Sequence, residues 1–220
     1  MSFSALSPSI SSSGIKSILS ALQKMDIDIN ALQNETGLSA FNLEDSELRI
    51  SCLYASECYN VGQKYWQGEN FGLQHGLHYQ PFMLGIVGHL LATANTALEA
   101  LMSFIRYQKA FGEGLRLDIV EQDNPVGSPA IVTEIVTEIV TEIVTEIVTE
   151  IVTAKMWIHP AMEDKVDSAI VDSFFVALMN CSRLLTGKNN PLIRVELKRR
   201  KPELSEDYER VFGCPVLFSQ

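Results

Sequence analysis

The chain closes with Pro191-Leu-Ile-Arg-Val195 and then Tyr208-Glu-Arg-Val-Phe-Gly-Cys-Pro-Val-Leu-Phe218, a pattern that predicts a strand, a short helix and a final strand. Apolar residues recur at helical spacing from Asp164 to Leu185, and Gly187 is placed to end that helix. Residues 114–121 alternate apolar and polar side chains, which is typical of a strand. These patterns predict an α+β fold, in which a helical N-terminal layer packs on a small, mostly antiparallel sheet. A long C-terminal helix then precedes the closing strand, helix and strand, and its expected inward residues are Val166, Ile170, Phe174, Leu178 and Leu185.

The N-terminal part divides into a Ser-rich start and a series of helical patterns. Residues 1–13 are expected to form a loose terminus, and residues 14–220 a single domain. Helices are predicted from Gly14 to Met25 and from Asp28, a candidate N-cap, to Glu35. A longer amphipathic helix is predicted from Asp45 to Trp66.

Residues 131–154 are six tandem copies of Ile-Val-Thr-Glu, the last of which ends in Ala154. Three of every four residues are β-branched, which favours a strand. A helix would place the glutamates four residues apart with no cation between them, and they would repel. Two hypotheses follow for this strand: a duplicated segment tolerated at the surface of the domain, or a β-pairing element for self-association.

Composition and charge limit the class of function. The 220 residues carry a net charge of −10 with a pI of about 4.9, which argues against direct contact with nucleic-acid phosphates. The basic run 198–201 is interpreted as exposed charge that guards a sheet edge, with a phosphate patch as the alternative. The four cysteines form no CxxC motif and predict a reduced, cytoplasmic protein. The longest apolar run, residues 83–94, is too short and interrupted to cross a membrane.

The sequence offers no strong catalytic signature. It contains no G-x-S-x-G, P-loop or H-E-x-x-H motif, and we expect neither an enzyme nor a cofactor. His75 and His78 lack the further ligand that a metal site requires, so no metal site is predicted. His89, within an apolar helix, is interpreted as a core histidine.

The stretch from Asn70 to Tyr107 is the most specific part of the sequence. Thr96-Ala-Leu-Glu99 has the spacing of a capping box, which predicts a helix from there to about Phe111. In order, the stretch contains Phe71-Gly-Leu73, Pro81, Gly85-x-x-Gly88, Thr96-x-x-Glu99-Ala-Leu101 and Arg106-Tyr107. Over residues 14–218 the sequence resembles the N-terminal, arabinose-binding-type sensor domain of AraC-type transcription regulators.

This resemblance implies a ligand-sensing regulatory domain that binds a small metabolite, with homodimerisation as a further expectation. In the family, a domain with two helix-turn-helix units follows and binds DNA. We expect that DNA-binding domain to be absent from this chain, so this chain would contact DNA only through such a domain and not by itself. We also expect no membrane partner. The sequence does not identify the effector, which could be a sugar, an amino acid or a fatty acid. The rival hypothesis is a protein-interaction module that self-associates by strand pairing through the repeat.

A sensor needs an apolar cavity with a few convergent polar groups. The candidate ligand-binding residues are Phe71, His75, His78, Tyr79, Phe82, Arg106 and Tyr107. Arg106 is the residue suited to hold a ligand carboxylate. The competing interpretation is structural: Phe71 and Phe82 as core, Arg106 as an exposed charge, and Tyr107 as packing.

Overall fold

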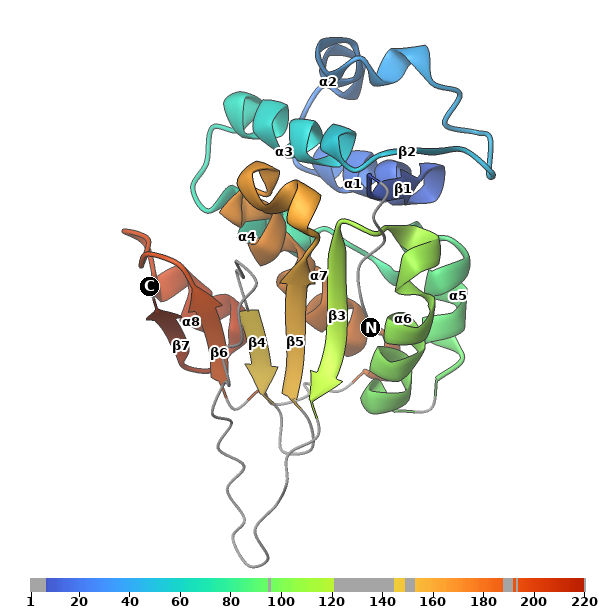
Figure 1. Cartoon of the computed structure of the whole chain (residues 1–220). Coiled ribbons are helices and arrows are strands. Elements are labelled where there is room, and N and C mark those ends of the chain that lie inside the picture. Colours follow the sequence, from blue (N-terminus) through green and yellow to red (C-terminus); the bar gives the residue numbers. More distant parts are fainter. Residues whose placement is uncertain are drawn as a thin grey trace, which may run out of the picture.

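A computed structural model describes residues 7–94, 96–120, 145–148, 153–187, 192 and 194–219 (Figure 1). The fold is α+β, as the sequence predicts. A helical layer made of α1 (Ser12–Lys24), α2 (Ile29–Thr36) and α3 (Leu53–Tyr65) lies across one end of a five-stranded sheet. The predicted N-cap Asp28 accepts hydrogen bonds from the backbone amides of Asn30 and Ala31, which fixes the start of α2.

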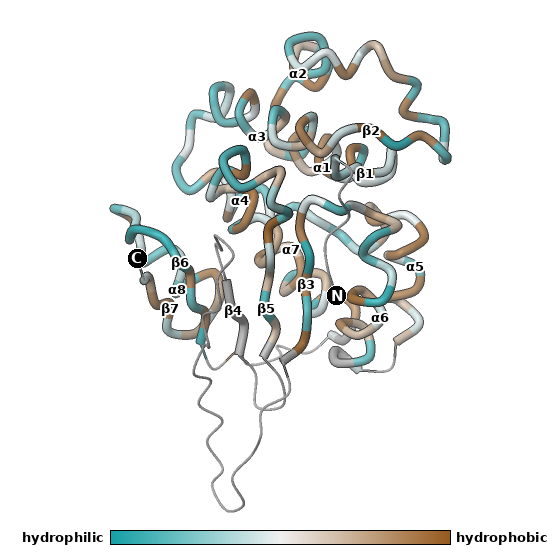
Figure 2. Tube along the Cα trace, viewed as in Figure 1, coloured by the Kyte–Doolittle hydropathy of each residue, from teal (hydrophilic) through white to brown (hydrophobic). Residues whose placement is uncertain are grey.

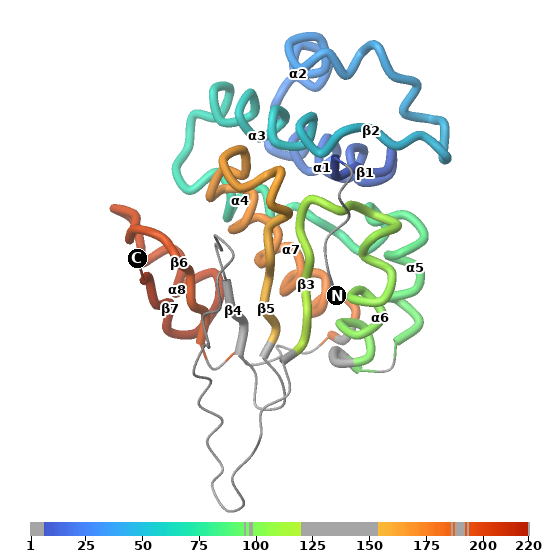
Figure 3. The backbone as a smooth tube through the Cα atoms, in the orientation of Figure 1, coloured from blue at the N-terminus to red at the C-terminus, as the bar shows by residue number. Residues whose placement is uncertain are grey.

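The sheet has the strand order β3-β5-β4-β6-β7. Its strands are β3 (Leu115–Val120), β4 (Thr145–Val148), β5 (Thr153–Ile158), β6 (Arg194–Lys198) and β7 (Val216–Ser219). Every neighbouring pair is antiparallel except β6 and β7, which are parallel. A parallel pair requires a crossover, and α8 (Glu206–Phe212) supplies it. The predicted closing strand, helix and strand are therefore confirmed, and Figure 3 shows them at the sheet edge opposite α6.

The described part of the repeat is strand, as predicted. β4 consists of repeat residues, and it pairs antiparallel with β5 from Val148↔Thr153 to Thr145↔Met156. β4 also pairs with β6, so both of its edges are occupied inside the sheet. Residues 131–144 and 149–152 of the repeat lie outside the described residues.

The N-terminal segment differs from the sequence-based expectation in two places. Residues 9–11 are not loose but form β1 (Ser9–Ser11), in which Ile10 is buried. β1 pairs with β2 (Arg49–Ser51), so the helix expected from Asp45 begins only at Leu53. The cause is long-range pairing: the backbone of residues 49–51 is hydrogen-bonded to a strand about forty residues earlier, which a local helical pattern does not reveal.

Helix α7 (Ser168–Thr186) is the central helix of the fold. It begins four residues later than predicted, at the N-cap Asp167, and ends at Gly187, which has the predicted left-handed conformation. It packs on α3, α4 (Phe71–Leu77), α6 (Ala97–Phe111) and α8. Its window Ser168–Leu185 is long and apolar enough to match a membrane span, unlike the shorter apolar run at residues 83–94. Half of that window is buried within the fold, which accounts for its composition.

Three short 3-10 helices and one further α-helix complete the described elements. These are η1 (Leu38–Ala40), η2 (Pro81–Leu84), η3 (Pro160–Lys165) and α5 (Ile86–Ala92). α5 lies against α6, which in turn contacts β3. The predicted cap Thr96 accepts a hydrogen bond from the amide of Glu99 at the start of α6. Figure 2 shows α5 as largely hydrophobic, whereas β3 and β5 alternate in hydropathy as half-buried strands do.

Two glycines allow α4 to lie directly on α7. A Cβ atom on Gly72 would come within 2.5 Å of the carbonyl oxygen of Ala169, and one on Gly76 within 2.6 Å of that of Ser173. These obstacles are backbone atoms of α7, so they cannot rotate away. The close approach places His75, which lies between the two glycines in sequence, against the centre of α7.

We expect Gly76→Ala to lower the free energy of unfolding by about 2 kcal/mol, because the added methyl group forces the two helices apart. Urea unfolding measures the change. Gly112→Ala is the matched control, since a Cβ atom there would meet nothing closer than 3.6 Å. Equal stability of the two variants would show that α4 and α7 are not held at this separation.

Candidate functional site

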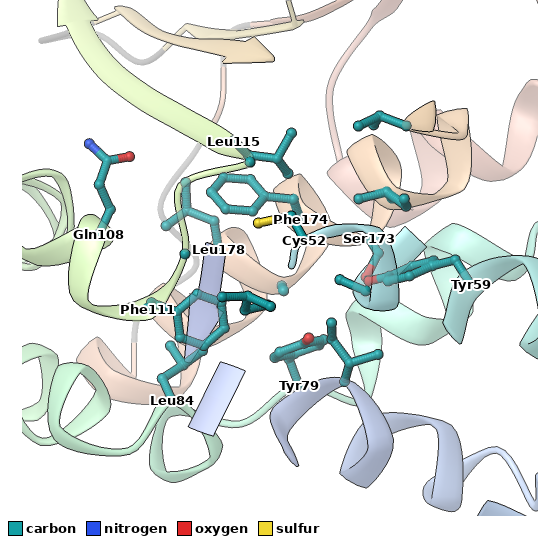
Figure 4. Close-up of a pocket in the computed structure, with 18 of the residues that line it drawn as sticks. Cys52, Tyr59, Tyr79, Leu84, Gln108, Phe111, Leu115, Ser173, Phe174 and Leu178 are labelled. Carbon is teal, nitrogen blue, oxygen red and sulfur yellow. The ribbon is translucent and has the colours of Figure 1, made fainter. Parts of the chain in front are cut away.

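The centre of the molecule contains a partly open cavity of about 130 Å³, lined by α1, α3, α5, α6, α7 and the start of β3 (Figure 4). Helix α7 supplies one wall through residues spaced three and four apart, which share one face of a helix. These are Ile170, Ser173, Phe174, Ala177, Leu178 and Cys181. The predicted inward residues Val166, Ile170, Phe174 and Leu178 all line the cavity. Other elements add a mainly apolar lining that includes Ile10, Ile18, Ala55, Leu84, Leu91, Phe104, Phe111, Leu115 and Met162.

One side of the cavity carries a buried polar network. Ser173 Oγ lies 2.6 Å from His75 Nδ1 and 2.9 Å from the Tyr59 hydroxyl. His75 Nε2 lies 3.2 Å from the carbonyl oxygen of Ile18, which can only accept. The proton of His75 is therefore on Nε2, and Nδ1 accepts. This network joins α1, α3, α4 and α7 through four residues.

Burial sets the protonation of this network. It lowers the pKa of His75 from 6.5 to about 4, so the imidazole is neutral at pH 7. Burial also raises the pKa of Tyr59 and that of Tyr79, whose ring packs on His75 with centroids 5.3 Å apart. The hydroxyl of Tyr79 lies 3.4 Å from Ser17 Oγ, which itself donates to the carbonyl oxygen of Gly14. Both tyrosines are neutral donors at the cavity wall.

On the other side of the cavity, Gln108 connects α6 to β3. Its side-chain oxygen accepts from the amide of Leu117 at 2.6 Å, and its side-chain nitrogen donates to the carbonyl oxygens of Leu117 and Ile105. Figure 4 shows Gln108 on one side of the cavity and Tyr59, Tyr79 and Ser173 on the other. Since both amide protons of Gln108 are used, this residue holds the wall in place.

The residue before Ser173 belongs to a second buried cluster, which we call the C-terminal triad and which consists of Asp172, Arg199 and Tyr208. Arg199 Nη2 lies 2.8 Å from both carboxylate oxygens of Asp172 and 2.6 Å from the Tyr208 hydroxyl. That hydroxyl donates to Asp172 at 2.6 Å. Burial raises the pKa of Asp172 to about 6, although Arg199 and Tyr208 both act to lower it. The triad fastens α7 to β6 and α8.

The C-terminal triad corrects one sequence interpretation. Arg199, in the basic run expected to be exposed, has a largely buried side chain that is paired with Asp172. β6 is also an interior strand between β4 and β7, so this run does not guard a sheet edge. Arg183 of α7 adds a second tie, because it donates to the last carbonyl oxygens of α8, those of Val211 and Phe212.

The structure divides the predicted ligand-binding residues into three groups. Tyr79 lines the cavity. Phe71 and His75 are buried just behind its polar side, where their rings stack, and His78 is half-buried nearby. Phe82, Arg106 and Tyr107 are exposed, Phe82 to 65%, so Phe82 is not core, and His89 is also exposed rather than core.

Sequence reasoning missed Tyr59, Gln108 and Ser173. The signal for Ser173 was available, since it lies on the apolar stripe of α7 between Ile170 and Phe174. Tyr59 had no such signal, because its partner Ser173 is distant along the chain. Gln108 had none either, because its role depends on the packing of α6 against β3.

The contact between Ser173 and His75 has the distance of a nucleophile and its base, but the surroundings do not support catalysis. A pKa of about 4 makes His75 a weak base at pH 7. Ser173 also lies in the middle of α7, where backbone amides are used within the helix and cannot form an oxyanion hole. Within the described ranges, no group of three or more His, Cys, Asp or Glu residues is placed to hold a metal ion.

A mainly apolar cavity with a few neutral hydrogen-bonding groups is typical of a domain that binds a small molecule. A sequence model of the arabinose-binding domain found at the N-terminus of AraC transcription regulators matches residues 27–220. The chain belongs to this family and is a ligand-sensing regulatory domain. No curated protein shows significant similarity to the chain.

Proposed function

We propose that this domain binds its effector in the central cavity and reports occupancy through α7 to the C-terminal strand, helix and strand. The cavity itself carries the proposal: a space of about 130 Å³ lies at the centre of a domain whose family senses ligands. Because a ligand shifts a conformational equilibrium only if it binds two states differently, the cavity must touch an element that can transmit the change.

Helix α7 is suited to this role. Ser173 faces the cavity, and the preceding residue, Asp172, holds Arg199 after β6 and Tyr208 of α8. A small rotation or shift of α7 on ligand binding would therefore move both Arg199 and Tyr208. In an AraC-type regulator the DNA-binding domain follows this end of the sensor. We therefore propose that the sensor controls DNA binding by such a domain.

Three finer parts of the function belong to the same proposal. All four cysteines are unpaired and buried, which fits a reducing, cytoplasmic setting. Homodimerisation remains a prediction, and the exposed side chains of Phe82, Ile86 and Met102 are apolar surface available for it. We infer no catalytic role.

The rival function, self-association by strand addition through the repeat, finds less support. Strand addition needs a free strand edge. β4, the described strand of repeat residues 145–148, is already paired on both sides by β5 and β6. The sensor is therefore the function that the described residues favour.

Filling the cavity should abolish ligand binding. In Ala177→Phe an aromatic ring replaces a methyl group that lines the cavity, and it would occupy the space of the ligand. Thermal unfolding of the wild-type chain against sugars, amino acids and small neutral organic molecules should give a saturable rise in stability for at least one compound. At a hundred times its dissociation constant, that compound adds about 2.7 kcal/mol. Ala177→Phe should lose this increment.

Ala110→Phe is the matched control, because it makes the same change on the exposed side of α6 and should leave the increment intact. A ligand that stabilises the wild-type chain and Ala177→Phe equally would place the effector outside the cavity and contradict the proposal.

A further inference from the structure

We infer that the effector is a small uncharged molecule with an apolar body and one or two hydroxyl or carbonyl groups. This inference rests on the proposed function, since it takes the cavity as the binding site. It is drawn from three properties of the cavity: the absence of charge in the described lining, the way its polar groups are already used, and its volume.

No Lys, Arg, Asp, Glu or His is among the described residues that line the cavity. The nearby cation Arg49 is committed elsewhere, because its guanidinium donates to the carbonyl oxygens of Lys109 and Ala110 at 3.1 Å. An ionised group placed inside the cavity would therefore have no partner of opposite charge among these lining residues, which is strongly unfavourable. This disfavours amino acids and carboxylates, including the carboxylate that Arg106 was expected to hold.

The polar groups at the wall also limit how many hydroxyl groups a ligand can satisfy. Gln108 uses both amide protons on Ile105 and Leu117. Ser173 and Tyr59 bond to each other and to His75. Two hydroxyl groups keep capacity for a ligand. Tyr79 contacts Tyr59 and lies 3.4 Å from Ser17, whose proton goes to a carbonyl oxygen, and Ser56 also lines the cavity. A sugar, with four or more hydroxyl groups, would leave most of them unpaired.

The volume and the shape of the lining point to a compact, flat or branched molecule. A cavity of about 130 Å³ is close to the size that accepts benzene, about 150 Å³ in an apolar cavity. The rings of Phe104, Phe111 and Phe174 lie in the wall and offer surfaces for an aromatic guest.

The test compares four probes by isothermal titration calorimetry at neutral pH: benzyl alcohol, toluene, benzoate and L-arabinose. We expect benzyl alcohol to bind at least about a hundredfold more tightly than benzoate, because only benzoate buries a charge. L-arabinose should bind more weakly than benzyl alcohol as well. In Tyr79→Phe, benzyl alcohol should lose about fivefold in affinity while toluene is unchanged, since only the alcohol loses a hydrogen bond.

The outcomes separate the ligand class from the site. Tighter binding of benzoate or L-arabinose, lost in Ala177→Phe, would overturn the ligand class and leave the cavity as the site. Benzyl alcohol binding that survives in Ala177→Phe would overturn the site. If no probe binds, xenon NMR distinguishes the two remaining explanations. Entry of xenon into the cavity would show that the cavity is accessible and that the inferred ligand class is wrong. Exclusion of xenon would contradict the proposed function.

Discussion

Arg199→Met should lower the free energy of unfolding by about 4 kcal/mol, the largest loss expected from any single change discussed for this protein. The side chain of Asp172 is 4% exposed and receives Arg199 at 2.8 Å. Removal of the guanidinium leaves the carboxylate buried with only the Tyr208 hydroxyl as a charge-stabilising partner. The cost arises from that uncompensated charge rather than from the net strength of the ion pair. Urea unfolding at neutral pH measures it.

A double variant distinguishes charge from packing. Asp172→Leu combined with Arg199→Met removes both charges and should recover most of the lost stability, because a buried ion pair replaced by apolar side chains is often neutral or stabilising. Lys198→Met, on the neighbouring residue of β6, is the control for the loss of one cation and should change stability little. A double variant as unstable as Arg199→Met alone would mean that the side chain of Arg199 acts by packing.

The second large effect is a loss of stability in acid that depends on His75. Its pKa is about 4 in the folded chain against 6.5 as an ordinary value, so the unfolded state binds the proton first as the pH falls. The contribution of the neutral imidazole is therefore fully present above pH 6.5 and is lost as the pH falls through about 4. The linked change in the free energy of unfolding is about 3 kcal/mol.

His75→Gln isolates this effect, because glutamine does not titrate. Urea unfolding of the wild-type chain and of His75→Gln between pH 7 and pH 4 should give curves whose difference shifts by that amount in favour of the variant as the pH falls. Asp172 has the opposite sign, since its raised pKa of about 6 makes its contribution fall as the pH rises. It titrates in both proteins and cancels in the difference. A flat difference curve would mean that His75 is protonated equally in the folded and unfolded states.

Elements defined by neighbouring residues were predictable from the sequence. Asp28 and Thr96 cap the helices that follow them, and Gly187 ends α7 as predicted. The failures have a different physical origin. Residues 49–51 join a strand rather than a helix because they pair with residues 9–11, and such pairing leaves no local periodicity.

The site was less predictable than the fold because helix spacing tells which residues share a face, but not what that face meets. Phe82 and Arg106 had suitable chemistry for a pocket, yet both are exposed. The stripe on α7 was visible, and its members Ile170 and Phe174 do line the cavity. Arg199 seemed a surface charge in a basic run, and only the fold brings it to Asp172.

The composition of β4 has a consequence for variation in the length of this protein. Its four residues, Thr145-Glu-Ile-Val148, have the same sequence as residues 141–144 and as the equivalent four residues of earlier copies. A coding repeat that gains or loses one unit stays in frame, and an identical block then takes the position of β4 in the sheet. We expect the change to fall on the chain between β3 and β4, where four more residues cost on the order of 0.1 kcal/mol in closure entropy. We therefore expect chains with one copy more or one copy fewer to keep the same sheet.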